Sequence, residues 1–97
     1  MHLYKILSLK NWQNSQSQEI LALSDDDKEF IHFSTHEQLE RILQKYWADG
    51  GEYIVLKVDS EKLLGRLVFE ANPGGVNKYY HLYDGAIPLR AVEEQIS

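Results

Sequence analysis

The sequence contains no cysteine, so it can form neither a disulfide framework nor a thiolate nucleophile or metal ligand. It also lacks a long apolar run. Lys5 and Lys10 interrupt the N-terminal segment MHLYKILSLK, which therefore predicts neither a signal peptide nor a membrane span. We accordingly expect a cytoplasmic protein without a membrane partner.

Basic residues are few and scattered. Ten Lys and Arg face fifteen Asp and Glu, for a net charge of -5. Nucleic-acid binding needs clustered positive charge, so we expect no nucleic-acid partner. Phosphate-loop, dinucleotide-fold and serine-elbow motifs are also missing, and the pair Gly74-Gly75 alone predicts a turn.

The composition is that of a globular protein. Its 97 residues are 43% hydrophobic and 26% charged, which predicts one domain over residues 1–97, as a monomer or weak homodimer. The charged run 24–28, SDDDK, is interpreted as a solvated surface loop, because a calcium loop needs alternating ligands and a distal Glu.

Hydrophobic periodicity predicts an α+β fold with a mainly antiparallel sheet and two principal helices, at 8–16 and 36–47. Ser8 and Thr35 are the expected N-caps, with Gln38 in capping-box position. The second helix carries an apolar stripe of Leu39, Ile42, Leu43 and Tyr46. Strands are expected at 2–7, 30–33, 53–58, 66–70, 79–83 and 87–92, with turns at 72–75 and at Asp84-Gly85.

Two histidines stand in mid-strand positions among apolar residues. His32 and His81 occur in FIHFST and YYHLY, where burial and neighbours set the state of an imidazole. His36 lies four residues after His32, but the expected cap at Thr35 separates them, so a zinc pair is not expected. On composition alone, the favoured interpretation of each mid-strand histidine is a structural histidine that is hydrogen-bonded to the backbone.

Glu70 ends an apolar strand just before a glycine turn, where a carboxylate can act as a base or stabilise a cation, or can simply be solvated. Tyr4, Tyr79, Tyr80 and Tyr83 could stack on a planar ligand or belong to the core.

Ordered segments along nearly the whole chain resemble the bacterial domain of unknown function 952 family. They are Tyr4-Lys5-Ile6, Trp12, FIHFST with Gln38, Leu56 to Asp59, Glu70, Gly74-Gly75, His81-Leu82-Tyr83, Gly85, Pro88-Leu89 and Val92. The resemblance implies an ADP-ribosyltransferase-like fold, a split antiparallel structure that holds NAD between two sheets. In that fold NAD is a substrate and not a resident cofactor.

The resemblance also implies a candidate site. Its catalytic residues would be His32, His81 and Glu70, with the choice between Glu70 and His81 for the late polar position left open. Ligand contacts would come from Tyr4, Lys5, Ser34, Thr35 and Tyr83. Breaking a nicotinamide–ribose bond produces cationic character that a carboxylate such as Glu70 would stabilise.

Two departures from the family pattern bear on function. The turn after Glu70 lacks the basic residue found in many relatives, and Tyr80 stands where a proline often precedes the HLY segment. Lys5 and Arg66 are the cations nearest in the sequence that could neutralise a bound phosphate.

Taken as a whole, the resemblance implies a protein that binds NAD or an ADP-ribose-like nucleotide, with transferase activity left open. The alternative is a non-catalytic module that binds a ligand or a protein.

Overall fold

The computed structural model describes residues 1–48 and 51–96. Its strands form two three-stranded antiparallel sheets, which confirms the expected α+β class with a mainly antiparallel arrangement and two helices. The first sheet has the order β1-β3-β6 and the second the order β2-β5-β4. The strands are β1 His2–Ser8, β2 Ile31–His32, β3 Tyr53–Asp59, β4 Leu64–Ala71, β5 Lys78–Ala86 and β6 Val92–Gln95.

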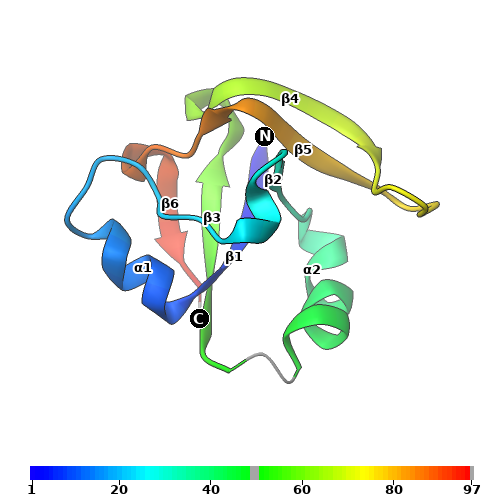
Figure 1. Cartoon of the computed structure of the whole chain (residues 1–97), viewed down its shortest axis with the longest axis horizontal. Helices are drawn as coiled ribbons and strands as arrows, with labels where there is room; N and C mark the ends of the chain where they lie inside the picture. The colour runs from blue at the N-terminus through cyan, green and yellow to red at the C-terminus, as the bar shows by residue number, and fades with distance from the viewer. Residues whose placement is uncertain (49–50, 97) are drawn as a thin grey trace.

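The two sheets meet at one point of the backbone. Tyr4 N–H donates to the Ser34 carbonyl at 2.8 Å, and Ser34 N–H donates to the Tyr4 carbonyl at 2.9 Å. In Figure 1 the β4–β5 hairpin runs over the top of the molecule, and β1, β3 and β6 run down its centre with a helix on either side. The sheets are therefore split, and the segment after β2 lies at the junction.

Strand β1 is buried on both of its faces. Leu3 and Leu7 belong to the larger core, which lies between the two sheets and α1 Leu9–Ser15. Tyr4 and Ile6, on the opposite face, form a smaller core with Val55. The predicted alternation of side chains along 2–7 is thus correct. Lys5 lies in the middle of this strand, where neither face is open to solvent.

Both predicted helix caps are present. The Asn11 N–H donates to Ser8 Oγ at 3.1 Å at the start of α1. At the start of α2, His36–Ile42, the Thr35 N–H donates to Gln38 Oε1 at 3.0 Å as part of a capping box. The loop ahead of α2 is consequently fixed by its own side chains.

The second helix changes type partway along, which the periodicity did not predict. After Ile42 the chain continues as a π-helical turn, η2 Leu43–Trp47. The wider i→i+5 spacing rotates the following residues, so the expected position of Tyr46 in the apolar stripe is wrong. Tyr46 is 57% exposed, and Trp47 packs on the smaller core in its place.

Two expectations for the C-terminal third are also wrong. Asp84-Gly85 is not a turn, because β5 continues through Ala86 with Asp84 at φ +52°. The strand register shifts there, opposite Gly65, as in a bulge. The expected strand 87–92 is a 3-10 turn at Leu89–Ala91 followed by β6.

The predicted turn 72–75 is confirmed. Gly75 N–H donates to the Asn72 carbonyl at 2.8 Å, and Gly74 has φ +78°, which suits a type II turn with Pro73 before it. This turn joins β4 to β5 and positions Asn72. Among the helices of residues 1–48 and 51–96, none has the length and apolar character needed to span a membrane.

Candidate functional site

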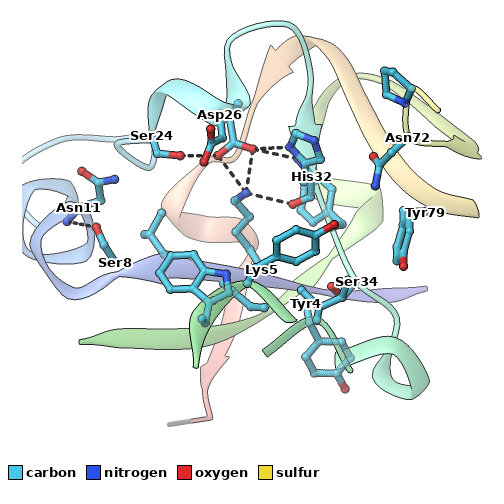
Figure 2. A pocket seen from close by; sticks show the side chains of 18 residues that line it. Tyr4, Lys5, Ser8, Asn11, Ser24, Asp26, His32, Ser34, Asn72 and Tyr79 are labelled. Carbon is cyan, nitrogen blue, oxygen red and sulfur yellow. Dashed lines mark hydrogen bonds and ion pairs between the residues drawn. The ribbon is translucent and has the colours of Figure 1, made fainter. Parts of the chain in front are cut away.

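A cavity of about 660 Å³ opens beside the junction of the two sheets. Figure 2 shows its walls, which come from β1, the end of β2, the helical segment after α2 and the β4–β5 turn. Its aromatic lining residues are Tyr4, Phe33, Tyr46, Trp47 and Tyr79, and its polar ones include His32, Ser34 and Asn72. A concave site whose walls combine aromatic rings with polar groups is suited to a small molecule that carries both.

Lys5 lies at the inner wall with only 4% of its surface exposed. Its Nζ lies 3.0 Å from each carboxylate oxygen of Asp27 and donates to the His32 carbonyl at 3.0 Å. Burial lowers the pKa of Lys5, and the Asp27 charge only partly offsets that effect. The lysine expected to contact a ligand is therefore held by the protein itself.

Asp27 is the main residue that sequence reasoning missed. It belongs to the 3-10 turn Asp25–Asp27, and its side chain is only 5% exposed, so the interpretation of SDDDK as a solvated loop is wrong at this position. Burial by itself would raise the pKa of Asp27. The hydrogen bonds from His32 and the charge of Lys5 outweigh burial and lower the pKa to about 2. Asp27 is thus a carboxylate at neutral pH.

His32 joins Asp27 to the cavity. Its Nδ1 and its backbone N–H each lie 3.0 Å from Asp27 Oδ1, while 41% of its side chain is exposed. Among the described residues, no hydrogen-bond partner reaches His32 Nε2. Figure 2 shows this group of Lys5, the acidic turn and His32 along one side of the cavity.

A second polar cluster adjoins His32. His81 is fully buried, with Nδ1 3.0 Å from Glu70 Oε1 and Nε2 2.9 Å from Asn72 Oδ1. The Tyr83 hydroxyl also donates to Glu70 Oε1. Hydrogen bonds from Tyr83 and His81 lower the pKa of Glu70, and the same bond to Glu70 raises the pKa of Tyr83. The Glu70 carboxylate is therefore engaged by two neighbours.

Aromatic contacts connect the two clusters. The Phe30 ring stacks on His81 at 4.1 Å between centroids, and the His32 and His81 rings meet edge to face at 5.4 Å. The two mid-strand histidines thus lie side by side, as their register pairing in β2 and β5 requires.

The predicted site residues separate into three groups. Tyr4, Lys5, His32 and Ser34 line the cavity. Thr35 serves in the α2 capping box. Glu70, His81 and Tyr83 make up the second cluster and are not part of the cavity lining, although Asn72 belongs to both. The catalytic and binding roles assigned to these eight residues remain predictions.

One sequence signal could have revealed Asp27. A lysine in a strand buried on both faces needs a counter-ion, because an unpaired buried charge is strongly unfavourable. The nearest acidic run after Lys5 is 25–27. For metal binding, the described ranges 1–48 and 51–96 hold no group of three or more His, Cys, Asp or Glu side chains placed to bind an ion.

Fold and cavity together define a small split α+β domain with a ligand-sized cleft where its two antiparallel sheets join. Residues 6–95 match the family described as protein of unknown function (DUF952), and the chain belongs to that family. No curated protein sequence matches the chain.

Solved structures with the same fold come from Caulobacter crescentus. The crystal structure of its protein CC0527 is 30% identical, with a TM-score of 0.83 over 99% of this chain and 84% of that one. A variant of the same protein with two introduced methionines is 29% identical, with a TM-score of 0.82 over the same shares of the two chains.

Proposed function

We propose that the cleft binds a nucleotide-like ligand, with NAD or an ADP-ribose derivative as the leading candidates. The observation that carries this proposal is the 660 Å³ cavity in which aromatic rings face accessible polar groups at the junction of two sheets. Its volume falls within the range of about 300–1,000 Å³ usual for ligand pockets. The split of the sheets also resembles the ADP-ribosyltransferase-like arrangement, in which NAD lies between two sheets.

Base and ring contacts would come from the aromatic walls. Tyr4, Tyr79 and Trp47 offer faces or edges to a planar ring. Ser34 lines the cavity with 5% of its surface exposed, so its hydroxyl can bind a ribose hydroxyl there.

Phosphate placement follows from the charges around the cavity. Lys5 is neutralised by Asp27, and Asp26 also lines the cavity, so the inner end does not favour anions. Arg41 Nη2 donates to the Tyr79 hydroxyl at 3.1 Å, which brings a guanidinium to the cavity rim. We therefore place the diphosphate at this rim and the nucleoside portion inside. Arg66, the other predicted cation, stacks on Tyr83, outside the lining.

A second candidate is a binding module that performs no chemistry. The observation in its favour is the engagement of Glu70 by His81 and Tyr83, which removes the expected cation-stabilising carboxylate from the cavity lining. Both candidates require that the cleft binds a ligand. The first is compatible with a chemical change in that ligand, and the second excludes one.

Isothermal calorimetry with NAD, ADP-ribose and nicotinamide riboside tests the proposal. We expect NAD to bind, and a ligand at a hundredfold its Kd to stabilise the fold by about 2.7 kcal/mol. Arg41→Gln should weaken NAD by about fivefold, since an exposed ion pair contributes up to about 1 kcal/mol, and should leave nicotinamide riboside unchanged. Arg90→Gln, on an exposed turn, is the matched control. Absence of heat with all three ligands at millimolar concentration would refute the proposal.

A further inference from the structure

We propose that His32 and Asp27 form a general-base pair, in which His32 Nε2 takes the proton from a water molecule or ligand hydroxyl bound between it and Ser34 Oγ. The inference rests on the proposed function, because it needs a ligand in the cleft. It goes beyond that function by assigning a reactive centre that does not use Glu70.

The geometry orients one nitrogen of the imidazole. Asp27 Oδ1 accepts a hydrogen bond from the backbone N–H of His32 and lies 3.0 Å from its ring Nδ1. The carboxylate therefore fixes both the backbone and the imidazole of His32. An ionised carboxylate can only accept hydrogen bonds, and it therefore selects the tautomer with the proton on Nδ1. The lone pair of Nε2 is then left free, and the His32 side chain lines the cavity.

Lys5 keeps the carboxylate in place. Its ammonium group lies 3.0 Å from both oxygens of Asp27 and is itself fixed by the His32 carbonyl. The His32 ring is also confined by Phe30, at 4.7 Å between centroids, and by the edge contact with His81. A base held by a third group and by packed rings is the usual arrangement for proton abstraction.

Ser34 is a positioning residue in this scheme and not the nucleophile. His32 and Ser34 are two residues apart, and both line the cavity. Among the described residues, no hydrogen bond joins their two side chains. An oxygen bound between the two side chains can contact both.

The chemical step balances with water as the only co-reactant. Nε2 removes a proton from water while the water oxygen forms a bond to the anomeric carbon of the nicotinamide ribose. The carbon–nitrogen bond breaks, and its electron pair moves to the ring nitrogen and cancels the positive charge there. Neutral nicotinamide leaves, and His32 then releases its proton to solvent. The products of NAD are ADP-ribose, nicotinamide and one proton.

The tautomer of His32 can be measured without any ligand. Long-range ¹H–¹⁵N NMR on the uniformly labelled protein distinguishes the two ring nitrogens of each histidine. We expect the neutral His32 ring to carry its proton on Nδ1, and the exposed His2 to serve as the internal reference. A proton on Nε2 of His32 would overturn the proposal whatever the ligand result.

The catalytic role of His32 is tested by measuring the release of nicotinamide from NAD, with chromatography as the detection method. We expect slow release by the native chain. His32→Gln should lower the rate at least about a hundredfold, the minimum usual for a general base. His2→Gln is the control. Calorimetry should show that NAD still binds to His32→Gln.

Each outcome decides between the two proposals. If NAD binds to the native chain and no nicotinamide appears, or if His32→Gln and His2→Gln release it equally, the general-base proposal is wrong and the binding proposal stands. If none of NAD, ADP-ribose and nicotinamide riboside binds, the binding proposal fails. In that case, a proton on Nδ1 of His32 would still support the His32–Asp27 general-base pair, acting on another hydroxyl ligand. A proton on Nε2 would refute the general-base proposal too.

Discussion

Replacing Asp27 by Asn tests the buried ion pair most directly. Lys5 is 4% exposed, and the substitution leaves its ammonium group without a carboxylate partner, while the His32 carbonyl still accepts from it. Removing one partner of a buried pair costs about 3–5 kcal/mol. For a chain of this size, each kcal/mol lowers Tm by about 4–8 °C, so we expect a fall of about 12 °C or more.

Urea denaturation followed by circular dichroism gives the free energy of unfolding for this comparison. Asp25→Asn makes the same charge change two residues away, where the side chain is 93% exposed, and should stay within about 0.5 kcal/mol of the native chain. The double variant Lys5→Met/Asp27→Leu should recover most of the lost stability, because apolar groups of similar volume replace buried pairs well. An Asp27→Asn protein within 1 kcal/mol of the native chain would refute the reasoning.

The same ion pair also predicts a dependence on pH. The pKa of Asp27 is lowered from 3.8 to about 2 in the folded chain, so its carboxylate form favours folding. The contribution is about 2.4 kcal/mol at 1.36 kcal/mol per pKa unit; it is fully present above about pH 4 and is lost as the pH falls toward 2. Stability measured between pH 5 and 2 should therefore fall more steeply in the native chain than in Lys5→Met/Asp27→Leu.

Two further substitutions test the fold around the site. Gly85→Ala would place a Cβ 1.7 Å from the Leu64 carbonyl oxygen, and we expect a loss of about 2 kcal/mol or more in urea denaturation; a neutral result would mean that the bulge opposite Gly65 is wrongly described. Trp47→Ala should lower the free energy of unfolding by about 2 kcal/mol, since Trp47 packs on the smaller core. Tyr46→Ala should change it by no more than about 0.5 kcal/mol, and urea denaturation measures both. The reverse order would contradict the π-helical turn.

Local patterns predicted the elements whose determinants are close in sequence. The Thr35–Gln38 capping box and the turn at Pro73-Gly74 depend on residues a few positions apart, and both are present. Asp84-Gly85 shows the limit of such patterns, because the same dipeptide suits a turn or a bulge. Here the strand partner at Gly65 determines which one forms.

The site was only partly predictable for a similar reason. His32 and Ser34 stand in a recognisable motif, and the structure places both on the cavity wall. The three consecutive Asp residues are locally equivalent, and only the position of Lys5 across the fold selects Asp27 for burial. Long-range pairing of this kind leaves no periodic trace in a single sequence. The change of helix type after Ile42 is likewise absent from the 3.6-residue pattern.

The burial of β1 on both faces has a consequence for how the chain unfolds. Leu3 and Leu7 complete the larger core, and Tyr4 and Ile6 the smaller one, from alternate positions of one strand. Neither core can therefore lose β1 without the other losing it too, and the register with β3 depends on both. We therefore expect both cores to unfold together, and the amide hydrogens of β1 to exchange with solvent only when the whole structure opens.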